Sequence, residues 1–132
     1  MRPPRFLAFV IDTLKNTPGA VQVRTLEEAG DSKHPFGVVV TTADGESRWG
    51  IVGQLAEGER HEHKEHPVEG APAAWTDAVP GDPEGWLAAA IGRAESPEIE
   101  RIQRWSTTQN GPSGQGLTIA FHNGAKAYVR KL

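Results

Sequence analysis

The chain has 132 residues, of which 37% are hydrophobic and 23% charged, and its formal net charge is −3. This length and composition predict a single soluble domain around one core. The absence of cysteine excludes a disulfide scaffold, a thiolate metal site and a cysteine nucleophile. The apolar run Phe6–Ile11 is too short for a secretory signal or a membrane span of about 20 residues. We therefore expect a cytoplasmic protein without a membrane partner.

The first third of the chain predicts a helix, a strand and a hairpin. The helix follows Pro3-Pro4 and stops before Pro18-Gly19, with apolar residues at helical spacing: Leu7, Val10, Ile11 and Leu14. Residues 21–26 alternate like a strand, and residues 27–35 form a polar loop. A hairpin then extends to about Leu55.

Residues 56–81 form an acidic connection rich in His and Pro, and they show no useful periodicity. A connection of this length is uncommon inside a compact domain. We expect Trp75 to attach part of it to the core, because tryptophan is highly buried on average.

The last third of the chain repeats the pattern of the first. Asp82-Pro83-Glu84 is a typical helix start, and Ser96-Pro97 ends the predicted helix. Residues 99–109 are ambiguous: a spacing of three suits a helical turn, whereas the run Trp105–Thr108 favours a strand. We expect a short turn followed by a strand. A second hairpin closes the chain.

The two hairpins share one pattern, 79 residues apart, in which Gly37–Trp49 aligns with Gly116–Tyr128. Each segment runs from a glycine through β-formers to Asp44-Gly45 or Asn123-Gly124, the dipeptides typical of two-residue hairpin turns. Such turns put Trp49 and Tyr128 in equivalent positions. The expected cross-strand pairs are Val40 with Trp49 and Ile119 with Tyr128.

These elements predict an α+β domain. An antiparallel sheet is built from two α-β-β-β units, residues 1–55 and 82–132, which residues 56–81 connect, and two helices pack on one face. An internal duplication would explain the repeated order. The alternative is that two unrelated hairpins share a length.

One cluster of residue types suggests a metal site. His61, His63 and His66 lie close together in the acidic connection, and they suggest a hypothetical zinc or nickel site. None of the three is four residues from another, so they do not form the helical zinc motif. The alternatives are a solvated loop and a pH-sensitive contact, and no cofactor is predicted.

Basic residues near the C-terminus suggest a nucleic-acid surface. They alternate with Trp105 and Tyr128, so phosphate contacts and base stacking are one hypothesis. The low pI of about 5.9 argues against it, and both aromatics are candidates for the core. The candidate binding residues are Arg101, Arg104, Lys126, Arg130 and Lys131.

No catalytic residue can be named. Paired carboxylates have no neighbours that would desolvate them, and the chain contains no G-x-S-x-G turn or phosphate-binding glycine loop. We therefore predict a non-enzymatic interaction or regulatory module that binds a protein partner through a sheet edge or the acidic connection. The alternatives are a nucleic-acid-binding protein, an enzyme with a pocket between the two halves, and a homodimer formed through a sheet edge.

Overall fold

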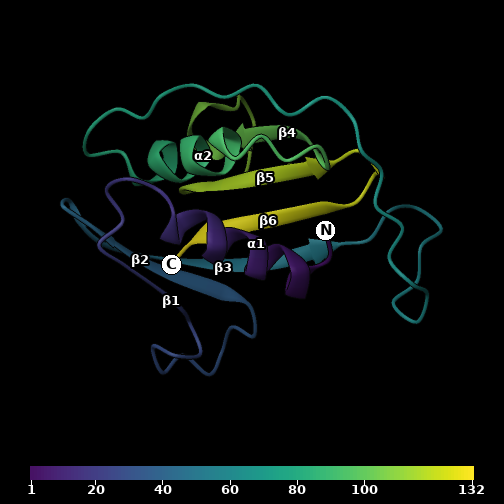
Figure 1. The fold of residues 1–132 in the computed structure, drawn as a ribbon, viewed down its shortest axis with the longest axis horizontal. Coiled ribbons are helices and arrows are strands. Elements are labelled where there is room, and N and C mark those ends of the chain that lie inside the picture. The colour runs from purple at the N-terminus through teal and green to yellow at the C-terminus, as the bar shows by residue number, and fades with distance from the viewer.

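The protein, described over residues 1–132 by a computed structural model, contains two α-helices, one short 3-10 helix and six strands (Figure 1). The elements are α1 (Pro3–Lys15), β1 (Gln22–Thr25), β2 (Gly37–Thr42), β3 (Gly45–Gln54), α2 (Pro83–Arg93), β4 (Ile99–Arg104), η1 (Trp105–Thr107), β5 (Gly116–Phe121) and β6 (Lys126–Lys131).

All six strands form one antiparallel sheet in the order β1-β2-β3-β6-β5-β4. Each half contributes three neighbouring strands, and β3 pairs with β6 at the centre. Both helices lie on the same side of the sheet, α1 over the first half and α2 over the second (Figure 1). The predicted α+β class, with two helices on one face of an antiparallel sheet, is confirmed.

The hairpins differ in detail from the prediction. The first turns through Ala43-Asp44, because Gly45 already pairs with Thr42, whereas the second turns through the three residues 122–124. The glycine with positive φ (Gly45 at +117°, Gly124 at +91°) thus follows the turn in one hairpin and ends the turn in the other.

The cross-strand pairs change with the turns, so both predicted pairs are wrong. Trp49 lies opposite Val38 instead of Val40, and Tyr128 lies opposite Thr118 instead of Ile119. Trp49 is fully buried in the core, whereas the Tyr128 hydroxyl donates to Gln54 on the opposite face of the sheet. The two aromatics are therefore not equivalent, and an internal duplication is not confirmed.

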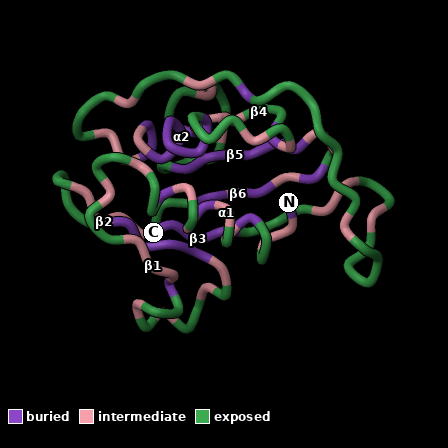
Figure 2. The backbone as a smooth tube through the Cα atoms, in the orientation of Figure 1, coloured by how far each residue is buried: buried purple, intermediate pink, exposed green.

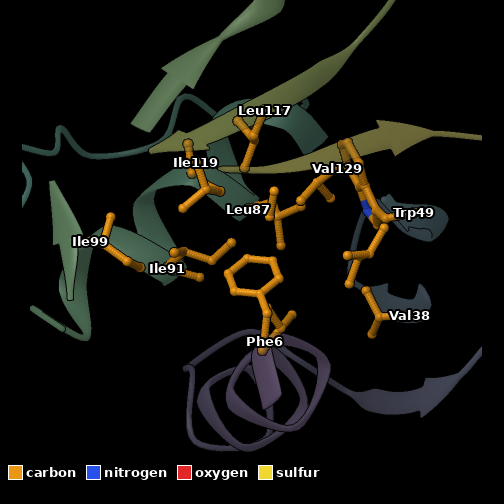
Figure 3. Packing of buried hydrophobic residues seen from close by; sticks show 14 of the residues in the cluster. Phe6, Val38, Trp49, Leu87, Ile91, Ile99, Leu117, Ile119 and Val129 are labelled. Carbon is orange, nitrogen blue, oxygen red and sulfur yellow. The ribbon is translucent and has the colours of Figure 1, made fainter. Parts of the chain in front are cut away.

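The core lies between the helices and the sheet. In Figure 3, Phe6 projects from α1 toward Leu87 and Ile91 of α2 and the sheet residues around them. Phe6 also meets Phe121 of β5 edge to face, with ring centroids 5.7 Å apart, a favourable aromatic geometry. One side chain from the first helix thus joins both halves of the domain.

The acidic connection covers the outer side of α2. In Figure 2, α2 is almost entirely buried although the connection passing beside it is mostly exposed. Trp75 of the connection packs on Gly92, and the Arg93 guanidinium lies 5.0 Å from the centre of the Trp75 ring. From the same connection, Ala73 is buried in the core cluster. A helix enclosed on all sides is apolar all round, which explains the small residues Ala88–Ala90.

Residues 99–109 fold in the reverse of the expected order. The strand β4 comes first, and Trp105 begins the 3-10 turn that follows it. Ile99 and Ile102 share the helix-covered face, although they are three residues apart, because a bulge near Glu100 shifts the register of β4. Trp105 instead packs on the opposite face of the sheet, against Gly116. Neither helix is long and apolar enough to cross a membrane.

Trp49 provides a test of the core. We expect Trp49→Ala to lower the free energy of unfolding by roughly 3–5 kcal/mol, because it removes a fully buried aromatic side chain. Chemical denaturation at equilibrium measures the change. Val52→Ala is the control, because Val52 lies in the same strand but is 66% exposed. This variant should lower the free energy of unfolding by less than about 1 kcal/mol. A similar small loss for Trp49→Ala would contradict the packing described.

Candidate functional site

The face of the sheet away from the helices, here called the open face, carries a row of glycines. Gly37 of β2 pairs with Gly50 of β3, which pairs with Arg130 of β6, which in turn pairs with Gly116 of β5. Four neighbouring strands therefore contribute only one side chain along this row. Glycine inside a strand often marks a place where another group approaches closely.

The two outer glycines are covered by the protein's own side chains. A Cβ atom on Gly37 would lie 2.2 Å from Leu26, and one on Gly116 would lie 2.4 Å from the Trp105 ring. Leu26 and Trp105 are themselves buried. At Gly50, by contrast, a Cβ atom would make only ordinary contacts, at 3.5 Å from His34 and Leu132. The row is thus tightly filled at both ends and more loosely covered at Gly50, and a hollow lies beside Gly50 toward Val52 and Tyr128.

The hollow is a groove of about 660 Å³, here called the central groove. Its floor is formed by the central strands β3 and β6, at Gly50, Val52 and Tyr128. The loop before β2, residues 33–36, lines one side, and Trp105 with Pro112 lines the other. A volume of this size is typical of ligand pockets, about 300–1,000 Å³.

The central groove is mostly apolar, and its charged groups are cationic. Lys33 and Arg130 line it together with His34, whose Nδ1 lies 3.0 Å from Asp31 Oδ2, and no carboxylate side chain is among the lining residues. The paired strand positions of the open face extend this bias. One of them is acidic, Glu46, whereas the basic ones are Arg24, Arg48, Arg101, Lys126 and Arg130.

Three of the five basic residues singled out from the sequence, Arg101, Lys126 and Arg130, occupy this face. Arg104 and Lys131 do not, because they alternate to the helix-covered side of β4 and β6. The five therefore do not form one surface.

Arg104 belongs instead to a buried polar cluster around Glu84 at the start of α2. Glu84 is fully buried and accepts hydrogen bonds from Arg104 Nε at 2.9 Å, the Gly116 amide at 2.9 Å, and the Ser106 amide and hydroxyl. Burial would raise the pKa of Glu84, but the hydrogen bonds from Ser106, Gly116 and Arg104 together hold it below its usual value. Glu84 is therefore ionised at neutral pH and ties α2 to β4 and β5.

Trp105 has a packing role rather than an exposed one. Its Nε1 donates to Thr118 Oγ1 at 2.9 Å, one edge of the ring rests on Gly116, and the Arg130 guanidinium lies 4.9 Å from the ring centre. The side chain is 4% exposed, so it offers no free face on which a base could stack.

The three clustered histidines do not converge. The backbone carbonyls of His61 and His63 accept from the Arg2 guanidinium, and that of His66 accepts from Asn123, while the loop around them is exposed. The structure contains no group of three His, Cys, Asp or Glu side chains placed to hold a metal ion. The Arg2 side chain thus attaches this segment to the start of α1 through its backbone carbonyls.

A second hollow, of about 690 Å³, lies between the two halves, next to the β2–β3 turn and the start of α2. Each carboxylate that lines it already has a partner. Asp44 accepts from the Gly81 amide, Asp82 caps α2 and binds Arg104, and Glu46 binds Arg48.

Sequence reasoning missed the central groove. Its defining residues, Gly50, Val52 and Lys33, show no motif, because only the strand register makes the glycines adjacent. A partial signal was present in the glycines that open the two hairpins, which pack against Leu26 and Trp105.

No protein-family model matches the chain, and no curated protein or solved structure matches it either. The function proposed below therefore rests on geometry and charge.

The Glu84 cluster provides a test by pH. Because the pKa of Glu84 is lower in the folded state, its contribution to stability is present above the unfolded pKa of about 4.3 and is lost as the pH falls through the folded value. We expect Glu84→Gln to cost roughly 1–3 kcal/mol at pH 7, because it leaves buried donors poorly paired. The loss should shrink as the pH is lowered below about 4.

Denaturation across pH 3–7 measures both effects. Glu69→Gln, at an exposed position without a hydrogen bond or ion pair, is the matched control and should change little. A Glu84→Gln variant whose stability follows the wild-type pH profile would contradict the ionised state of Glu84.

Proposed function

We propose that the protein is a non-enzymatic interaction module that docks a protein partner on the open face of its sheet. The observation that carries this proposal is the central groove, which has an apolar floor and cationic sides without any lining carboxylate side chain. The remaining surface of this acidic chain has no comparable feature among its larger hollows.

The residue types in the groove suit a protein interface. Tyrosine and arginine are enriched where binding energy concentrates, and Tyr128 and Arg130 meet here beside Val52 and Leu132. The sequence had suggested a sheet edge or the acidic connection as the docking element. The open face is the better candidate because it contains the central groove and carries Arg101 and Arg130, which have no carboxylate within 4.0 Å.

A nucleic acid is the second candidate, because the basic residues of the open face also suit phosphates. Base stacking is not supported, since Trp105 is buried beneath Arg130. Arg104 is not available for phosphates either, because it is bound to Glu84. A homodimer through the open face is disfavoured, since two basic faces would meet and like charges repel.

Arg130 provides the test of the docking face. We expect Arg130→Gln to weaken capture of a partner from native lysate by about tenfold, in line with the loss of one interfacial charge contact. Arg93→Gln is the matched control, because Arg93 also lies over a tryptophan but at the end of α2, away from the open face. Equal capture by both variants would argue against the open face.

Salt dependence separates the two candidates. Duplex binding through Arg24, Arg48, Arg101, Lys126 and Arg130 should fall steeply with salt, with a logarithmic slope of about −4 to −5. A protein partner with an apolar contact should show a modest slope. We expect gel-shift titrations with duplex DNA and RNA at two salt concentrations to detect no micromolar binding at physiological salt. Micromolar binding that collapses at high salt would favour nucleic acid instead.

A further inference from the structure

Within the proposed docking function, on which this inference rests, the groove also indicates the chemistry of the partner. We infer that the central groove receives a short acidic segment of the partner, with one apolar side chain seated on Val52 and Leu132 beside Gly50 and carboxylates bound by Arg130 and Lys33. The inference depends on the shape of the groove, the pairing of its cations and the geometry of Arg130.

The shape of the groove favours an apolar group beside Gly50. Leu26 fills the row of glycines tightly over Gly37, and the Trp105 ring does so over Gly116. His34 and Leu132 cover Gly50 only at ordinary contact distance, 3.5 Å, and Val52 and Leu132 remain 66% and 45% exposed. An apolar side chain of the partner would cover both exposed residues.

The pairing of the cations points to carboxylates. Among the nine arginines, seven have a carboxylate within 4.0 Å, and the two that lack one are Arg101 and Arg130. Both of these lie on the open face. None of the five lysines, Lys33 included, has a carboxylate within 4.0 Å, so the contrast rests on the arginines. In a chain with 17 acidic residues, cations left unpaired on one face favour an anionic partner.

The geometry of Arg130 leaves its donors free. Its guanidinium lies over the Trp105 ring at 4.9 Å from the centre, a contact made through the ring face. Stacking of this kind restricts the side chain but does not use the N–H groups, which can bind a carboxylate in the bidentate manner. Arg130 is thus positioned before the partner arrives, which lowers the entropy cost of binding.

A selection from a random-peptide display library tests the inference, with the intact protein as target. We expect enriched peptides to carry an apolar residue flanked by Asp or Glu. The best of them, labelled with a fluorophore, is then titrated by anisotropy against the wild type and the variants below.

Gly50→Val fills the groove. The new side chain would start from ordinary contacts at 3.5 Å, so the variant should fold, as its thermal midpoint will report, while peptide affinity falls at least about tenfold. Gln22→Val, which adds the same side chain to an exposed position of the open face outside the groove, is the control and should bind normally. Val52→Glu is the second groove variant, and it should repel the acidic peptide without disturbing the core.

The outcomes separate this inference from the proposed function. Peptides that are neutral or basic but sensitive to Gly50→Val would overturn the acidic segment and leave a docking face in place. Peptides insensitive to both groove variants, or no enrichment at all, would overturn the inference as well. If partner capture from lysate is also unaffected by Gly50→Val and Arg130→Gln, the proposed function fails with it.

Discussion

The pairing of β3 with β6 is the interaction on which the rest of this structure depends. Trp49–Gln54 pairs with Lys126–Lys131, so two three-stranded halves become one sheet through residues more than seventy positions apart. Neither half alone encloses Phe6, because Phe6 belongs to the first half and packs on Phe121 from the second. The same ladder sets Gly50 beside Arg130, so the core on one face and the groove on the other have a common origin.

Local features of the sequence predicted the elements well, because each depends on neighbouring residues. Asp82 caps α2 by accepting from the Gly85 amide, as a helix start of this type requires. The predicted pairs failed because register depends on which residue of a turn adopts positive φ, and Gly45 lies just after its turn. A shift of two residues kept Trp49 on the core face, so the fold class was unaffected by the error.

The candidate site was much less predictable, because it consists of residues that only the sheet makes adjacent. In the sequence, nothing distinguishes Gly37, Gly50 and Gly116 from ordinary hairpin glycines. Only the fold brings Leu26 onto Gly37 and Trp105 onto Gly116. The basic residues chosen from the C-terminal third were divided by strand alternation, which sent Arg104 toward Glu84 and Arg130 to the open face. The alternation of side chains along a strand assigns each arginine to a face only when the ends and the register of the strand are known.

The two stacked arginines show how charge in this chain is divided between folding and the proposed binding. Arg93 lies 5.0 Å from the Trp75 ring centre and has Asp77 at 3.7 Å, so its charge is balanced within the chain. Arg130 lies 4.9 Å from the Trp105 ring centre and has no carboxylate within reach. The first arrangement holds the acidic connection against α2 and is complete. The second has the same aromatic support without the acid, and on the proposal made here that acid comes from the partner.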